Sequence, residues 1–404
     1  MDGVEGREAA RRQDPRSRRD QPPDQRRRAS RTGRLADREL CERRRPRECD
    51  RGHRLRLLAR LEHGARPSRG AVGQAVCAGR RRKARIATPL GLTVPAGPTL
   101  ADGIADYIAA VRLTPPGERP PLETARLLAD RHADRIAIPR PEGMAVATSF
   151  VVGQGRETPI RIYRPAGDGA QAALVYFHGG GFTIGSIESY EPLAMGLAEA
   201  SGATVISVHY SRLPEATPRA IIDECFGVLG WAHAMPEELR IDPARIGVAG
   251  DSAGAFIAAQ LSILTRDRGG PAIAAQVLIY GMFDLVAREA HRTAEDPVLS
   301  WPVIEAMLHT WHECDARDPV GLPAPLRCAD LSGLPPAILL GAALDPMREE
   351  GDDYAGRLRA AGVAVETRTA PAMPHGFLRA LRFSAPARDE MTRLGTSIRT
   401  ILRT

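Results

Sequence analysis

Ser252 lies at the centre of a glycine-rich motif that is suited to nucleophilic catalysis. The motif is Gly250-Asp251-Ser252-Ala253-Gly254, and it stands between a predicted strand, Ile246–Ala249, and a predicted alanine-rich helix, Ala253–Thr265. A Gly-x-Ser-x-Gly turn between a strand and a helix is the nucleophile elbow, whose tight backbone requires small residues around the serine. The following helix would direct its N-terminal N–H groups at the reacting atoms. The pattern predicts acyl transfer with Ser252 as the nucleophile.

A second glycine-rich motif upstream is suited to binding the negative oxygen that such an attack creates. It reads His178-Gly179-Gly180-Gly181-Phe182 and directly follows an apolar run that ends at Phe177. Backbone N–H groups in a loop of this kind can bind an oxyanion. We expect the donors to be the N–H groups of Gly180, Gly181 and Ala253.

The other residues of the two motifs are expected to support the turns. Gly179, Gly250 and Gly254 supply the small residues that these turns need. We expect His178 to brace its loop through hydrogen bonds rather than to act as a base. Asp251 is adjacent to the serine, but its side chain should point away from the reacting atoms, so we assign it a structural role.

The serine needs a base, and the base needs an acid, in the chain order Ser, Asp, His. His375, in Pro374-His375-Gly376-Phe377, follows the last predicted strand. Asp345 follows the predicted strand before it and would hold the imidazole in the required tautomer. Asp352 and Asp353 are rival acids, but they are expected to cap the start of the next helix. The prediction is a triad of Ser252, His375 and Asp345.

Strands and helices alternate from about residue 98, which predicts a mostly parallel sheet with helices on both faces. One stretch, Phe283–Leu326, lacks a strong strand pattern and is expected to project from the sheet as part of a cap. The predicted strands are Thr148–Val152, Pro159–Tyr163, Leu174–Phe177, Thr204–His209, Ile246–Ala249, Gln276–Tyr280, Ala337–Leu340 and Val363–Arg368. The predicted helices are Leu100–Val111, Pro121–Ala137, Pro192–Ala200, Arg219–Ala234, Ala253–Thr265, Asp352–Ala361 and Pro386–Leu402.

The N-terminal part of the chain has a different composition. Residues 1–85 contain 26 Arg, one Lys and 12 Asp or Glu, a charge of +15, so the remainder of this +7 chain carries −8. No Phe, Tyr or Trp precedes Tyr107. Many like charges and little apolar surface predict a disordered extension over residues 1–97. Such charge also attracts nucleic acid or anionic lipid, but without interleaved aromatic residues we expect no nucleic-acid partner.

The same region raises a question about the start of the protein. The chain has a single lysine, Lys83, among 56 basic residues. This bias indicates a GC-rich genome, where translated upstream sequence would be rich in arginine, so we hypothesise that the natural start lies downstream of Met1. We find no clean signal core and no run of 18 apolar residues, so no membrane span is expected. The six cysteines form no paired framework, which favours a reducing compartment, the cytoplasm.

At these residues the chain resembles the hormone-sensitive-lipase-like esterases, bacterial family IV of the α/β hydrolases. The resemblance covers residues 98–404 and rests on HGGGF, GDSAG, the DPMREEG run from Asp345 to Gly351, and His-Gly-Phe at 375–377. It implies an α/β-hydrolase fold with an eight-stranded, mostly parallel sheet. It also implies a helical cap built from residues near 98–140 and 283–326, and no metal or organic cofactor. The substrate would be a small carboxylic ester with a short or medium acyl chain.

The chain departs from the family pattern at three places. His209-Tyr210-Ser211-Arg212-Leu213-Pro214-Glu215 stands where the family usually has Asp-Tyr-Arg-Leu-Ala-Pro-Glu. Ala255 follows the elbow where the family often has glycine, and Pro374 restricts the backbone of Met373. None of these changes removes a catalytic group, so they bear on substrate preference and efficiency. The pattern leaves a homodimer open.

Other functions remain compatible with this pattern. An amidase, a deacetylase or a biosynthetic tailoring hydrolase of the same fold would carry the same triad. A non-catalytic ligand receptor on this fold would have lost the triad histidine, and the presence of His375 argues against it. The serine carboxylic-ester hydrolase is therefore the leading hypothesis.

Deletion of residues 1–85 should leave folding and activity intact, because this segment has too little apolar surface to contribute to a packed core. The measurement compares thermal unfolding and ester hydrolysis of the truncated and full-length proteins. Loss of both in the truncated protein would show that the segment packs on the remainder of the chain.

Overall fold

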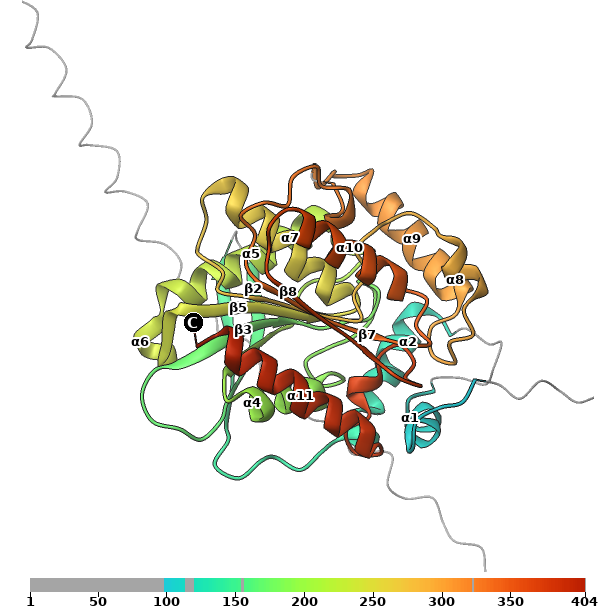
Figure 1. Ribbon diagram of the computed structural model, residues 1–404, viewed down its shortest axis with the longest axis horizontal. Helices are drawn as coiled ribbons and strands as arrows, with labels where there is room; N and C mark the ends of the chain where they lie inside the picture. Colours follow the sequence, from blue (N-terminus) through green and yellow to red (C-terminus); the bar gives the residue numbers. More distant parts are fainter. Residues whose placement is uncertain (1–97, 113–119, 154–155, 322, 404) are drawn as a thin grey trace, which may run out of the picture. The chain divides into compact units, whose positions relative to one another are not determined.

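The fold is built on one eight-stranded sheet in strand order β1-β2-β4-β3-β5-β6-β7-β8 (Figure 1). The computed structural model describes residues 98–112, 120–153, 156–321 and 323–403. β2 pairs in antiparallel fashion with β1 and with β4. From β4 onward in this order, through β3, β5, β6 and β7 to β8, every pairing is parallel. The predicted α/β class and mostly parallel sheet are therefore confirmed. The strands are β1 Ala145–Gly153, β2 Arg156–Arg164, β3 Gln171–Phe177, β4 Thr204–Val208, β5 Ile241–Asp251, β6 Gln276–Ile279, β7 Ala337–Ala342 and β8 Val365–Ala370.

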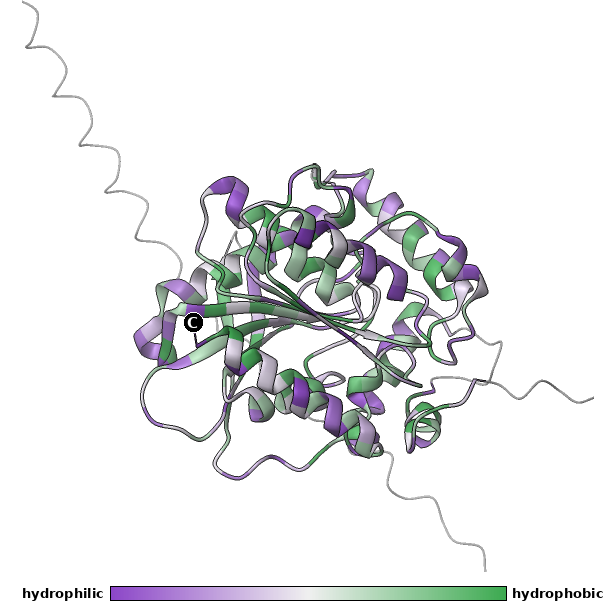
Figure 2. Cartoon of the chain, viewed as in Figure 1, coloured by the Kyte–Doolittle hydropathy of each residue, from purple (hydrophilic) through white to green (hydrophobic). Residues whose placement is uncertain are grey.

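Helices cover both faces of the sheet, as the alternating pattern predicts. α5, α7 and α10 lie on one face, and α4 and α11 lie on the other (Figure 1). The central strands are largely hydrophobic, whereas α10 carries many hydrophilic residues (Figure 2). The helices are α1 Ile104–Val111, α2 Leu122–Arg131, α3 Ala133–Ile136, α4 Glu191–Ser201, α5 Pro218–Ala234, α6 Pro236–Leu239, α7 Ala253–Arg268, α8 Glu289–Thr293, α9 Trp301–Asp315, α10 Arg348–Ala360 and α11 Ala385–Ile401, with short 3-10 helices at Pro325–Arg327 and Phe377–Arg379.

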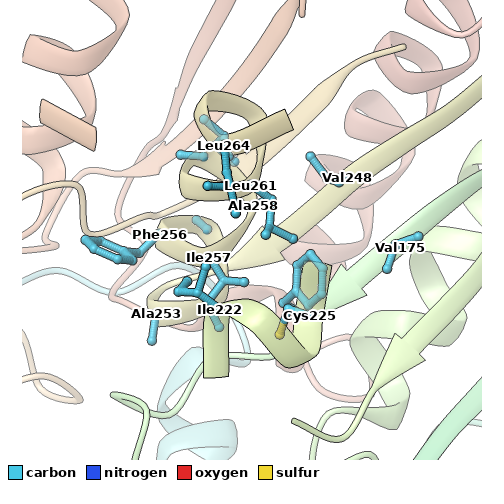
Figure 3. Close-up of a cluster of buried hydrophobic side chains, with 14 of the residues drawn as sticks. Val175, Ile222, Cys225, Val248, Ala253, Phe256, Ile257, Ala258, Leu261 and Leu264 are labelled. Carbon is cyan, nitrogen blue, oxygen red and sulfur yellow. The ribbon is translucent and has the colours of Figure 1, made fainter. Parts of the chain in front are cut away.

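α7 is the most completely enclosed helix on its face of the sheet. Every residue from Ala253 to Thr265 is buried. Its apolar side chains pack between the strand residues Val175 and Val248 and the α5 residues Ile222 and Cys225 (Figure 3). A helix that is apolar all round belongs in the interior of a domain. This burial fixes the N-terminus of α7, and with it Ser252, relative to the sheet.

The sequence-based helix boundaries are wrong at α10. The predicted helix begins at Asp352, with Asp352 and Asp353 as capping residues, but the observed helix begins at Arg348 and contains both inside it. The reason is the turn at Asp345, whose Oδ1 accepts the N–H of Met347 at 2.8 Å and whose carbonyl accepts that of Arg348 at 3.1 Å. These bonds start the helix one turn earlier than its apolar spacing indicates.

Two other regions bear on the sequence-based expectations. The stretch predicted to lack a strand, Phe283–Leu326, contains α8 and α9 joined by loops. The expectations for the N-terminal extension, including disorder and a natural start downstream of Met1, concern residues 1–97, which lie outside the described part of the chain. No helix within the described residues is long and apolar enough to cross a membrane.

Substitution of Gly395 by alanine should destabilise the fold, because α4 and α11 cross closely there. A Cβ at this position would lie 2.3 Å from the carbonyl oxygen of Ala200. We expect the free energy of unfolding to fall by about 1–3 kcal/mol, as for other overpacked sites, measured by urea denaturation. The matched control is Gly356→Ala in α10, where a Cβ meets no atom within 4 Å. The control should be stabilised by about 0.5–1 kcal/mol, and equal losses in both variants would contradict the argument.

Candidate active site

Strand pairing brings the two glycine-rich motifs together. β3 and β5 are parallel neighbours, with Phe177 opposite Gly250. The HGGGF loop leaves the end of β3, and the elbow leaves the end of β5. In sheets of this type, ligands bind outside the carboxyl ends of the strands. The two motifs therefore meet at the edge of the sheet where a ligand is expected.

The elbow holds Ser252 in a conformation that L-residues rarely adopt. Its φ is 53° and its ψ is −120°. A Cβ on Gly250 would lie 2.1 Å from the carbonyl oxygen of Gly254, and a Cβ on Gly254 would lie 1.9 Å from that of Phe177. Both glycines are thus required by close backbone contacts. Strain of this kind persists only where the surrounding structure imposes it, and it is common at active sites.

The loop after β3 presents backbone N–H groups next to the serine. Gly180, Gly181 and Phe182 have positive φ angles of 112°, 58° and 61°. The N–H groups of Gly180 and Gly181 have no acceptor among the residues that the structure describes. The N–H of Ala253 is in the first turn of α7, where N–H groups lack partners within the helix. These three groups are the predicted oxyanion donors, and the fold places their segments side by side.

Asp251 connects the loop to the elbow. Its Oδ1 accepts the Gly179 N–H at 2.9 Å and the Tyr176 hydroxyl at 2.6 Å. Burial raises the pKa of this carboxyl to about 6, while Tyr176, Arg379 and the Gly179 N–H oppose that rise. The side chain thus makes the structural contacts that its place in the motif suggested, and Tyr176 is a partner that the sequence pattern did not reveal.

His178 lies beneath the same loop. Its ring is fully buried and stacks on Tyr210 and Tyr190, at centroid distances of 4.4 and 5.4 Å. Burial lowers the pKa of the ring to about 3, so the imidazole is neutral. Its Nδ1–H donates to the Gly179 carbonyl at 2.8 Å, and its own carbonyl accepts the Tyr210 hydroxyl at 2.6 Å. A neutral ring held in this way braces the loop.

His375 and Asp345 reach Ser252 from the other half of the sheet. β7 and β8 pair in parallel, with Ala342 opposite Ala370, so the loops that follow them lie side by side. His375 Nε2 lies 2.7 Å from Ser252 Oγ, and its Nδ1 lies 2.7 Å from Asp345 Oδ2. The structure therefore brings the three predicted residues into one hydrogen-bonded chain.

The charges around His375 favour its protonated form. Burial alone lowers the pKa of the imidazole, but Asp345, Asp296 and Asp251 outweigh it and raise that pKa above its ordinary value. Asp345 contributes both charge and a hydrogen bond. The opposite shift, a His375 pKa below the ordinary value, would suit a permanently neutral histidine. A raised value suits one that takes up a proton from the serine.

Several residues that contact the site could not be identified from the sequence. Asp296 accepts the backbone N–H of His375 at 2.6 Å, and Tyr107 donates its hydroxyl to the Gly376 carbonyl at 3.2 Å. Met307, on α9, lies against Gly181, because a Cβ there would be 3.2 Å from its Cγ and Sδ. These contacts join residues far apart in the chain, and no local motif marks them.

Comparisons with known proteins identify similar sequences and structures. A family model described as the α/β-hydrolase fold matches residues 174–379. The chain is 40% identical over 246 residues to carboxylesterase NlhH of Mycobacterium tuberculosis, and the aligned region covers 59% of this chain and 76% of that protein. It is 34% identical over 244 residues to an ethyl acetate hydrolase of Pseudomonas putida, covering 57% and 74%. A solved structure of an esterase from Pyrobaculum calidifontis superposes with a TM-score of 0.64 and 31% identity, covering 69% and 93%.

Replacement of Asp251 by alanine should loosen the oxyanion loop, because the Gly179 N–H loses its acceptor. We expect Ser252 to react about tenfold to a hundredfold more slowly with a nitrophenyl phosphonate, whose phosphoryl oxygen would occupy the same anion site. The rate of adduct formation is followed by intact mass. Asp251→Asn is the matched control, since its carbonyl oxygen can still accept both hydrogen bonds, and it should retain most of the rate. A wild-type rate in the alanine variant would contradict this role.

Proposed function

Because the chain belongs to the α/β-hydrolase family, in its hormone-sensitive-lipase-like group, we propose that Ser252, His375 and Asp345 hydrolyse carboxylic esters through an acyl-enzyme. The protein is a carboxylic-ester hydrolase of the serine type. The observation that carries the residue assignment is the unbroken chain from Ser252 Oγ through the imidazole to Asp345, with both contacts at 2.7 Å.

The first half of the reaction transfers the acyl group to the enzyme. Ser252 Oγ attacks the ester carbonyl carbon while His375 Nε2 takes its proton. The carbonyl oxygen becomes an oxyanion and accepts hydrogen bonds from Gly180, Gly181 and Ala253. When this intermediate collapses, the bond to the alcohol oxygen breaks, and that oxygen takes the proton from His375 Nε2. The alcohol leaves, and the acyl group remains on Ser252.

The second half uses water in place of the serine. A water oxygen attacks the acyl carbon and gives its proton to His375 Nε2. The bond to Ser252 Oγ then breaks, and Oγ regains the proton as the carboxylic acid departs. In both halves Asp345 accepts the Nδ1–H of His375, which keeps the lone pair of Nε2 directed at Ser252 and stabilises the imidazolium.

A cluster of large side chains supports a short or medium acyl chain. Phe182, Phe256 and Trp311 pack together beside the oxyanion loop, with ring centroids 4.5–5.6 Å apart. Met307, which belongs to α9 together with Trp311, lies against Gly181. We infer that α9 acts as part of a cap and that these side chains limit the room for a long acyl chain.

The cysteines support a reducing setting. Cys225, Cys314 and Cys328 are free and buried within the described residues. Disulfides are rare in the cytosol and common in oxidising compartments. We therefore propose the cytoplasm as the location of the enzyme.

Hydrolysis of nitrophenyl esters from acetate to palmitate tests the proposed function. We expect turnover to be highest with short and medium chains, and Ser252→Ala to lower kcat by about a thousandfold or more, because the nucleophile is lost. Ser262→Ala is the matched control, since Ser262 lies on the same helix and, within the described residues, its hydroxyl bonds to the Ala258 carbonyl alone, at 2.9 Å.

Two results would contradict the proposal. One is the absence of turnover with every ester in the series, and the other is full activity in Ser252→Ala. The corresponding nitroanilides separate the rival functions, because an amidase would cleave them at a readily measured rate, whereas an esterase would leave the less reactive amide bond essentially intact.

A further inference from the structure

Asp296 is a buried carboxylate that contacts the backbone of His375. It lies in the loop between α8 and α9, and its exposed fraction is 8%. Its Oδ2 accepts the His375 N–H at 2.6 Å. Its Oδ1 accepts the N–H groups of Val298 and Leu299, at 2.7 and 2.9 Å. The Asp296 side chain therefore connects the segment just before α9 to the loop that contains His375, the predicted base.

The hydrogen bonds of Asp296 fit its ionised form. Both oxygens act as acceptors for backbone N–H groups, and an ionised carboxyl group offers acceptors only. A protonated carboxyl would place a donor where these N–H groups already point. A buried charge is costly unless it is paired or hydrogen-bonded. The three N–H groups offset that cost, and a protonated His375 ring nearby would offset more.

We propose that Asp296 is a positioning residue for this reaction, which holds the backbone of His375 in place and supplies a second negative charge for its imidazolium. The inference rests on the proposed function of the triad. Asp345 binds the ring of His375 at Nδ1, whereas Asp296 binds its main chain from the segment that carries α9. The two carboxylates thus fix the ring and the backbone of the same residue from different elements.

Within the described residues, charged groups and a tyrosine face His375 from four parts of the fold. Asp345 follows β7, Asp251 ends β5, and Asp296 belongs to the α8–α9 loop. The Tyr280 ring, which follows β6, lies edge-on to the imidazole at 5.2 Å. The three carboxylates raise the pKa of His375 against the effect of burial. Asp296 has His375 and Asp345 as its own charged neighbours, and burial raises its pKa.

The dependence of kcat/KM on pH in Asp296→Asn tests this role, with nitrophenyl acetate as the substrate. Asparagine keeps the size and one acceptor oxygen but carries no charge. Without that charge the pKa of His375 should fall, so the neutral base is available at lower pH. We expect the acidic midpoint of kcat/KM to move down by about half a pH unit and the plateau of kcat to fall about tenfold.

Three further variants separate charge from structure. Asp296→Glu retains the charge and displaces the carboxylate, so it should lower kcat without moving the midpoint. Asp284→Asn is the control for loss of a buried carboxylate: Asp284 lies before α8, accepts the Leu285 N–H at 2.9 Å and pairs with Arg327 at 2.7 Å, and within the described residues it makes no contact with the triad. It should leave the midpoint unchanged. Asp296→Ser provides a second neutral variant if the asparagine variant does not fold.

An unchanged midpoint in a folded neutral variant would overturn the proposal, and so would loss of folding in both neutral variants, which would assign Asp296 to stability alone. A wild-type enzyme that does not hydrolyse the ester, or a Ser252→Ala variant that does, would instead contradict the proposed function. The two failures are therefore distinguishable in one set of measurements.

Discussion

The site depends first on the parallel pairing of β3 with β5. With Phe177 opposite Gly250, the oxyanion loop and the elbow leave the sheet from adjacent positions. The contact is so close that a Cβ on Gly254 would lie 1.9 Å from the Phe177 carbonyl oxygen. Asp251 then joins the two turns through its bond to the Gly179 N–H. Displacement of either strand would separate Ser252, the proposed nucleophile, from the N–H groups proposed to bind the oxyanion.

The histidine side of the site is secured differently. His375 stands in a loop beyond β8, so strand pairing brings it near the acid loop but does not orient it. Its orientation comes from individual hydrogen bonds, including those of Asp296 to its N–H and of Tyr107 to the next carbonyl. The Met373 carbonyl also accepts the Leu344 N–H, at 3.0 Å, beside Asp345. The bonds of Asp296 and Tyr107 come from the segments between β6 and β7 and before β1, which lie outside the strand–helix alternation.

Three buried carboxylates surround His375. Asp251, Asp296 and Asp345 all lie around one imidazole, and each is less than a tenth exposed. Such carboxylates are costly to bury, and here backbone N–H groups, Tyr176 and Arg379 offset the cost. The result is a negative environment that is already in place when the imidazolium forms. Electrostatic groups that need not reorganise during the reaction are the ones that lower its barrier most.

The sequence by itself determined the class of fold, all eight strands in their approximate positions, and the residues that meet at the site. This was possible because those features have local sequence signals: buried strands read as apolar runs, and glycine-rich motifs directly after two of them mark tight turns. It misplaced the start of α10, where the side chain of Asp345 begins the helix before the apolar spacing does. Only the tertiary structure revealed Asp296, Tyr176 and Met307, because each acts on a residue distant in the chain. Asp296 and His375 are 79 positions apart, and chain folding alone determines that they touch.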